Sequence, residues 1–272
     1  MSETPVARFY DELAADYHLI YADWEASVRR QGEALDALIG PERVRVLDCS
    51  CGIGTQAIGL ARRGHHVVGT DLSPRAAARA AREAARRDLS LRTAAADMRH
   101  LPFSERRFDA VVCADNSLPH LLTERDVRAA LAEMRRVLRP AGLLMVSTRP
   151  YDDLVRDHPP STPPQVHGSA DDPGGEGRMV TFQLWHWHDD GERYDLEHFQ
   201  LLRTGGEWRV QVRRTTYWAL GRDTLCALAA EAGFVDIEWR LPEETGFFQP
   251  LLVARAGERR RGRGGPSRAP GP

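Results

Sequence analysis

Short apolar runs alternate with alanine-rich stretches from residue 44 to residue 149. The runs are almost continuously apolar, as in strands buried on both faces, and the stretches between them carry a helical period. Parallel strands need such crossover connections, so the pattern predicts an α/β fold with a doubly wound, mostly parallel sheet of seven strands. Ser73 and Pro74 mark one helix start, because serine caps a helix and proline suits its first position.

The segments that flank this core follow other patterns. Residues 5–39 are predicted to be helical, whereas residues 156–177 are rich in proline, glycine and aspartate and predict a loop. Three strand-like runs follow between residues 179 and 220, separated by the turn sequences DDGE and TGGE, and predict an inserted antiparallel β lobe. A last helix at 222–234 precedes two strands that we expect to close the sheet edge as a hairpin.

This organisation predicts four parts. They are an N-terminal helical cap (1–40), a Rossmann-like α/β domain (41–155 and 218–256), an inserted loop and antiparallel lobe that roofs the ligand site (156–217) and a disordered Arg/Gly/Pro tail (257–272). The tail has no apolar period that would let it pack.

Charge and composition narrow the class of protein. With 272 residues, 42% hydrophobic and 28% charged, the chain is long enough for one large core with a smaller lobe. A net charge of −2 argues against a nucleic-acid partner, and the absence of lysine excludes Schiff-base chemistry. No early apolar segment or bilayer-length stretch occurs, so we expect a cytoplasmic protein with no membrane partner, and a homo-oligomer stays open.

Cysteine and histidine do not indicate a metal site. The four cysteines lack paired CxxC spacing, and three lie in or beside predicted buried strands, where we expect small core residues. His186 and His188 share one face of a strand, but no further acids stand in register with them. We therefore expect no metal.

The strongest chemical signal is the run VLDCSCGIGT at residues 46–55, where an apolar strand enters a glycine turn that opens a helix. Gly52 and Gly54 let the backbone approach a ligand closely. Asp71 ends the next strand, where an acid can accept hydrogen bonds from both ribose hydroxyls of a nucleotide. The full GxGxxG pattern is absent, and Asp48 would repel a pyrophosphate but suits a sulfonium or ammonium group.

Two more strand ends complete this edge of the sheet. Asp97 and Met98 follow the third strand, where the acid can take an adenine amino group and the methionine can cover the ring. The fourth strand ends in ADNSLPHL. Residues 44–149 with these ordered motifs resemble the class I S-adenosylmethionine-dependent methyltransferases, which implies S-adenosylmethionine as cofactor and a small-molecule substrate.

A closer resemblance is to the glycine and glycine/sarcosine N-methyltransferases. It rests on Asp48, Ser50, Cys51, Gly52 and Gly54 in the first motif, on Asn116, Ser117, Leu118, Pro119, His120 and Leu121 after the fourth strand, and on Arg149, Pro150, Tyr151 and Asp152 after the fifth. The resemblance implies that Asn116 and Arg149 hold the acceptor, the arginine by gripping a carboxylate. It also implies cofactor contacts, which together with those argued above are Tyr21, Arg29, Asp48, Ser50, Gly52, Gly54, Asp71, Leu72, Asp97, Met98, Ala114 and His120.

These observations predict N-methylation of an amine or amino-acid-like acceptor by in-line attack on the sulfonium methyl, with Asn116, Arg149 and Tyr17 orienting the acceptor. No dedicated base is evident. The alternatives left open are O- or C-methylation of a secondary metabolite and a non-catalytic S-adenosylmethionine-binding protein. Methylation of a nucleic-acid base is disfavoured, because Asp115-Asn116-Ser117-Leu118 stands where such enzymes place an Asp/Asn-Pro-Pro-aromatic run.

Overall fold

The computed structural model describes residues 5–167 and 179–257. The predicted disordered tail therefore lies almost wholly outside the described residues, as do the last ten positions of the predicted loop.

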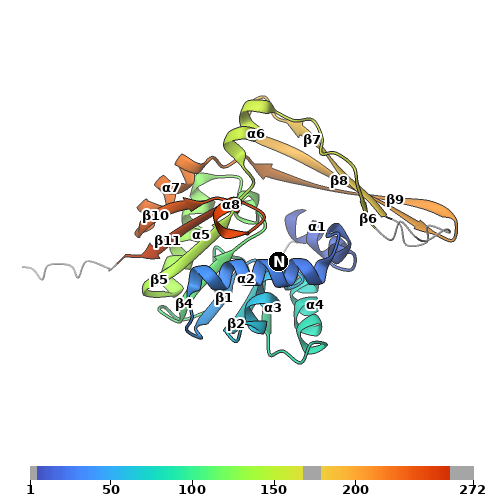
Figure 1. The fold of residues 1–272 in the computed structure, drawn as a ribbon. Coiled ribbons are helices and arrows are strands. Elements are labelled where there is room, and N and C mark those ends of the chain that lie inside the picture. The colour runs from blue at the N-terminus through green and yellow to red at the C-terminus, as the bar shows by residue number, and fades with distance from the viewer. Residues whose placement is uncertain (1–4, 168–178, 258–272) are drawn as a thin grey trace, which may run out of the picture.

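A mostly parallel sheet forms the centre of the molecule (Figure 1). Within the described residues it has seven strands in the order β10-β11-β5-β4-β1-β2-β3, and its only antiparallel pairs are those that β11 makes with β10 and β5. The predicted closing hairpin is thus confirmed, with its second strand inserted between β5 and its first. The strands are β1 (Arg45–Asp48), β2 (His66–Asp71), β3 (Arg92–Ala95), β4 (Phe108–Cys113), β5 (Leu138–Ser147), β10 (Phe234–Arg240) and β11 (Leu251–Ala256).

Helices cover both faces of this sheet, as the doubly wound prediction requires. On one face α2 (Trp24–Ile39), α3 (Thr55–Arg62) and α4 (Pro74–Ala85) bury residues such as Leu35 and Ile58 against β1. On the other, α5 (Glu124–Val137) and α7 (Arg222–Glu231) bury Leu131 and Leu225 against β1 and β4. Ser73 caps α4 by accepting a hydrogen bond from Ala76 N at 3.0 Å. Among the described residues, no helix has the length and apolar character needed to cross a bilayer.

A second, antiparallel sheet projects from the carboxyl end of the main one (Figure 1). It is inserted between β5 and α7 and has the order β6-β7-β8-β9 in the described part of the chain. The long strands β7 (Met179–Trp187), β8 (Arg193–Thr204) and β9 (Glu207–Trp218) confirm the predicted meander. The expectation of a structureless 156–177 segment was wrong in part, because α6 (Tyr151–Asp157) reaches into it and β6 (Gln165–His167) pairs with β7.

The N-terminal segment divides between two places. The first helix, α1 (Pro5–Leu13), and the short 3-10 helix η1 (Tyr17–Ile20) lie between the projecting sheet and α4, and α1 contacts both. The helix α2, in contrast, packs against α3 so closely that a Cβ on Gly32 would come within 2.6 Å of Gly59 backbone atoms. Residues 5–21 therefore cover the sheet edge, while α2 belongs to the core.

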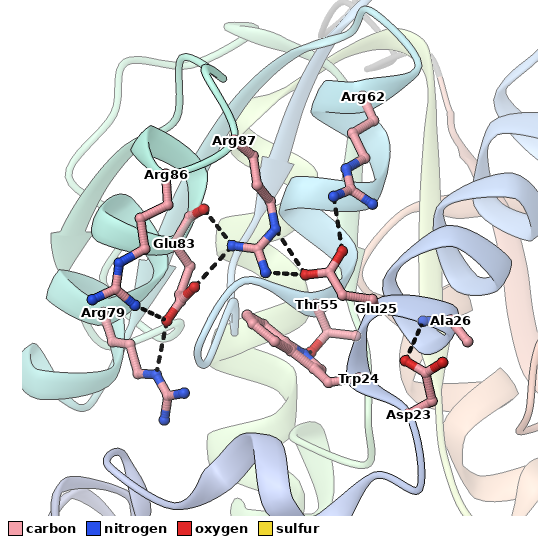
Figure 2. A network of polar contacts seen from close by, with 10 residues as sticks. All are labelled: Asp23, Trp24, Glu25, Ala26, Thr55, Arg62, Arg79, Glu83, Arg86 and Arg87. Carbon is pink, nitrogen blue, oxygen red and sulfur yellow. Dashed lines mark hydrogen bonds and ion pairs between the residues drawn. The ribbon is translucent and has the colours of Figure 1, made fainter.

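Polar contacts fasten the start of α2 to its neighbours, as Figure 2 shows. Trp24 Nε1 donates to Thr55 Oγ1 at 2.9 Å, at the first residue of α3. The Arg87 guanidinium lies 4.9 Å from the Trp24 ring centroid and binds Glu25 and Glu83, the latter at 2.8 Å. These contacts hold the segment that leads out of η1 beside the glycine turn.

Candidate functional site

The glycine turn after β1 is closed by the acid at the end of β2. Gly52 adopts a φ of +49°, which glycine tolerates best, and its N–H donates to Asp71 Oδ2 at 2.8 Å. Asp71 Oδ1 accepts from Ser73 N at 2.8 Å. Burial raises the pKa of Asp71 to about 6, although these two backbone donors oppose the shift. The buried carboxyl therefore sits at the carboxyl edge of the sheet, where open α/β folds bind ligands.

A cavity of about 260 Å³ opens at this edge, and it is called the larger cavity below. It brings together nine of the predicted site residues. They are Tyr17, Tyr21, Ser50, Gly52, Asp71, Leu72, Asp97, Met98 and His120. The described lining also includes Asp115 and Asp126. Arg99 is the one arginine in this lining, so carboxylates outnumber guanidinium groups there. Asp97 is itself held by Arg99, with an Oδ2 to Nη2 distance of 2.6 Å.

Three predicted cofactor contacts lie behind this lining. Asp48 is buried beneath the glycine turn, where burial raises the pKa of its carboxyl to about 7 and Oδ2 has no hydrogen-bond partner among the described residues. Gly54 caps α3 in a left-handed conformation (φ +99°), and a Cβ there would press on Ile58 and Ala80. Ala114 is buried at the end of β4. These residues lie behind the side chains that line the larger cavity and do not themselves line it.

Arg29 is not brought into the site, which corrects its prediction as a cofactor contact. Val28, Gly32 and Leu35 form the buried stripe of α2 that faces α3. Arg29 is one position away from this stripe and is exposed. The family resemblance was therefore misleading at this position, because the helix turns this side chain to solvent.

A smaller cavity of about 120 Å³ adjoins the larger one. The two share Tyr10, Tyr17 and Asp115 in their linings. The smaller cavity contains Asn116 and Arg149, as predicted for an acceptor site, and it is roofed by residues of β7, β8 and β9. These roof residues are Gln183, Leu196, His198 and Tyr217.

Arg149 presents a half-buried cation to the smaller cavity. Its Nη1 donates to Tyr194 Oη at 2.7 Å and its Nη2 to Gln183 Oε1 at 3.2 Å. The guanidinium carbon lies 4.8 Å from the Trp185 ring centroid and 5.1 Å from that of Tyr217. Aromatic faces and neutral oxygens stabilise the charge, but the described residues place no carboxylate in an ion pair with it. A half-buried guanidinium without a protein carboxylate can bind the anionic group of a ligand.

A strained turn after β4 supplies the opposite side of the smaller cavity. Asp115 and Asn116 both have positive φ, +57° and +62°, a conformation costly for any residue except glycine and tolerated best by asparagine and aspartate. Asn116 Oδ1 accepts from Arg149 N at 3.1 Å, which leaves its buried Nδ2 without a partner among the described residues. The turn thus places one carboxylate and one free amide donor at the cavity.

Neutral aromatic groups fill the junction between the cavities. Tyr10 Oη lies 2.8 Å from His120 Nε2, and the His120 ring centroid is 4.1 Å from that of Tyr217. Burial lowers the pKa of His120 to about 3, so the imidazole is uncharged at neutral pH. Burial also raises the pKa of Tyr17 and of Tyr21 well above the ordinary phenol range.

Sequence reasoning did not single out Asp115, His198 and Tyr217, which line the smaller cavity, or Tyr194, which binds Arg149 beside it. Asp115 was identifiable in principle, because it directly precedes Asn116 at a strand end on the ligand edge. Tyr194, His198 and Tyr217 carry only the signal of an alternating strand, with buried Tyr194, Leu196 and His198 between half-buried or exposed neighbours. Burial lowers the pKa of His198 to about 4, so this side chain too is neutral. No group of three or more metal-ligating side chains occurs in the described segments.

Comparison with known proteins agrees with the fold. A family model described as a methyltransferase domain matches residues 46–142. The glycine/sarcosine N-methyltransferase of Aphanothece halophytica is 32% identical over 218 residues, 79% of this chain and 76% of that one. The chain therefore belongs to the class I S-adenosylmethionine-dependent methyltransferases.

Other relatives share more restricted likenesses. The glycine/sarcosine N-methyltransferase of Parasynechococcus marenigrum (strain WH8102) is 43% identical over 135 residues, 49% of this chain and 48% of that one. The chain thus spans about half the length of the first curated relatives it matches. An amino pentose methyltransferase of Micromonospora echinaspora shares the fold, with a TM-score of 0.68 at 23% identity over 89% of this chain and 95% of that one.

S-adenosylmethionine is the cofactor of this class, and the larger cavity fits it chemically. A Cβ on Gly52 would come within 3.3 Å of the Tyr17 ring, so glycine keeps this part of the cradle open. Asp71 lines this cavity at the carboxyl end of β2, and the surplus of carboxylates in the lining suits a cationic nucleoside.

Proposed function

We propose that this chain is an enzyme that transfers a methyl group from S-adenosylmethionine to the nitrogen of a small amine that also carries an acidic group. The observation that supports it is Arg149, a half-buried guanidinium without a carboxylate partner among the described residues, in a small cavity that shares a wall with the larger one. The likeness to glycine/sarcosine N-methyltransferases supports the same substrate class.

In this proposal the larger cavity holds the methyl donor. Asp71 accepts hydrogen bonds from the ribose hydroxyls, and Asp97 and Met98 contact the adenine. The remaining walls are formed by the Gly52 turn, Ser50, Leu72, Tyr21 and His120. The bound cofactor supplies an electrophilic methyl group on a sulfonium. The chain contributes alignment and exclusion of water, which is how a site accelerates transfer between two bound molecules.

The smaller cavity orients the acceptor. Arg149 binds its anionic group with a planar fork of donors, and Asn116 Nδ2 offers a further hydrogen bond beside it. Tyr17 lines both cavities, so its ring borders the path between the two reactants. The neutral state of His120 and His198 means that neither repels a cationic donor or acceptor.

A screen with isotope-labelled S-adenosylmethionine against amines, amino acids, phenols, enols and thiols tests this function. We expect label only in small primary or secondary amines that bear an acid. Transfer to phenols or enols but to no amine would establish O- or C-methylation instead. Stoichiometric binding of the cofactor without turnover of any acceptor would identify a non-catalytic binding protein.

A further inference from the structure

The Asp115 carboxylate occupies the junction of the two cavities. It is half-buried, it lines both cavities, and it follows β4 in a strained left-handed turn. The rest of that turn, Asn116, belongs to the proposed acceptor site. The Asp115 carboxylate thus lies between the proposed sites of the methyl donor and the acceptor.

Only one of its two oxygens is used by the protein. Tyr17 Oη and Tyr21 Oη both donate to Oδ2, at 3.3 and 3.1 Å. Within the described residues no hydrogen bond and no ion pair reaches Oδ1, and Arg149 acts on the group through space without pairing with it. A residue that lines both cavities and has one carboxylate oxygen without a protein donor can accept a hydrogen bond there from a ligand N–H.

We propose that Asp115 receives the amine end of the acceptor, binding its N–H groups and then accepting its proton, while Arg149 holds the acid end. The preferred acceptor is therefore a short zwitterion bound by one half-buried anion and one half-buried cation. This inference rests on the proposed N-methylation, but it assigns to the chain a proton acceptor that the sequence did not indicate.

The proton step is balanced within the site. One N–H bond of the ammonium breaks, one O–H bond forms on Asp115, and the bonding pair stays on nitrogen as the lone pair that the reaction needs. Ammonium and carboxylate are both neutralised, so the net charge of the site does not change. The proton leaves Asp115 for solvent after the methylated product has departed.

The groups around Asp115 do not titrate between pH about 7.5 and 9. The phenols Tyr10, Tyr17 and Tyr21 have pKa values raised well above 10 by burial, and burial raises that of Tyr217 to about 12. His198 and His120 titrate near 4 and 3, and Arg149 stays charged. A pH dependence seen in this window reports the acceptor amine and its proton acceptor.

The first test compares two nearly isosteric probes. Sarcosine carries an ammonium and a carboxylate, whereas methoxyacetate replaces the ammonium by an ether oxygen. We expect calorimetry on the chain saturated with S-adenosylhomocysteine to show at least about tenfold tighter binding of sarcosine, a preference lost in Asp115→Asn. Equal affinity of the wild-type chain for the two probes would overturn the inference without any variant.

The second test follows kcat/KM against pH with the best amine from the acceptor screen. For the wild type we expect a flat profile over this window, because Asp115 takes the proton. For Asp115→Asn we expect a rise of about tenfold per pH unit, since asparagine cannot take a proton and only pre-deprotonated amine reacts. Asp109→Asn is the matched control and should behave as wild type, because the half-buried Asp109 lies at the start of β4, where it pairs with Arg139 and lines neither cavity.

The experiments distinguish a failure of the proposed function from a failure of the role assigned to Asp115. If the wild type methylates no amine, the proposed function fails and the inference with it. If the wild type methylates an amine but Asp115→Asn keeps both the sarcosine preference and the flat profile, the function stands and the role of Asp115 is wrong.

Discussion

The two cavities share a wall but are built in different ways. The larger cavity is assembled mainly from residues that directly follow consecutive strands, such as Ser50 and Gly52 after β1, Asp71 and Leu72 at the end of β2 and Asp97 after β3. The smaller cavity collects side chains from α1, η1, the ends of β4 and β5, and three strands of the projecting sheet. The lining of the larger cavity comes from residues 6–126, whereas that of the smaller cavity is drawn from residues 9–249.

Their electrostatics differ as well. Carboxylates dominate the larger cavity, whereas the smaller one sets the cation Arg149 against the single acid Asp115. We therefore expect substitutions in one cavity to affect one ligand and leave the affinity for the other nearly unchanged.

Removal of Arg149 should have the largest effect. Arg149→Ala should lower kcat/KM for an acidic amine by about a thousandfold, about 4 kcal/mol, because truncating one partner of a buried ion pair strands the other charge. Calorimetry should show unchanged affinity for S-adenosylhomocysteine. Arg125→Ala, at a 90% exposed side chain, is the control. An equal loss of nucleoside affinity in Arg149→Ala would refute the separation of the cavities.

Stability should depend on pH through Asp48, beneath the larger cavity. Its folded-state pKa of about 7 exceeds the unfolded value of 3.8, so the unfolded chain releases its proton first as pH rises. The free energy of unfolding should therefore fall between pH about 4 and 7, by about 3 kcal/mol from this group. Urea denaturation of Asp48→Asn should lack this part of the decline, and identical slopes in variant and wild type would contradict the assignment.

Asp71→Ala should produce the converse of the Arg149 result. We expect about a hundredfold weaker binding of S-adenosylhomocysteine, about 2.7 kcal/mol, because the ribose hydroxyls lose a buried acceptor. The Asp109→Asn control should bind normally. Thermal unfolding must be measured in parallel, because Asp71 also holds Gly52 N and Ser73 N. Unaltered nucleoside affinity in a folded Asp71→Ala chain would remove the basis for the larger cavity's role.

Tyr194→Phe should give the smallest effect. The substitution deletes one hydrogen bond to Arg149 Nη1 and keeps the aromatic ring, so the acceptor KM should rise about fivefold, about 1 kcal/mol. Nucleoside affinity should not change. A loss as large as that of Arg149→Ala would mean that Tyr194 contacts the acceptor itself.

The contrast explains what the sequence could predict. The sheet, its covering helices and Asp71 follow from apolar periodicity and from the rule that ligands bind at the carboxyl ends of parallel strands. Tyr194 and His198 could not be assigned, because their role depends on the pairing of β8 with β7 and β9 and on the position of that sheet over Arg149. Arg29 is an error of the opposite kind. The family resemblance suggested a cofactor contact, but the orientation of α2 turns this side chain to solvent.

Tyr10 and Tyr17 belong to the walls of both cavities, so neither compartment can fill without touching the surface of the other. Thermodynamic linkage then requires reciprocity: whatever factor the nucleoside applies to acceptor affinity, the acceptor must apply to nucleoside affinity. Under the proposed function, the rings of Tyr10 and Tyr17 are the surfaces through which binding of the methyl donor would alter the affinity for the acceptor, and the reverse.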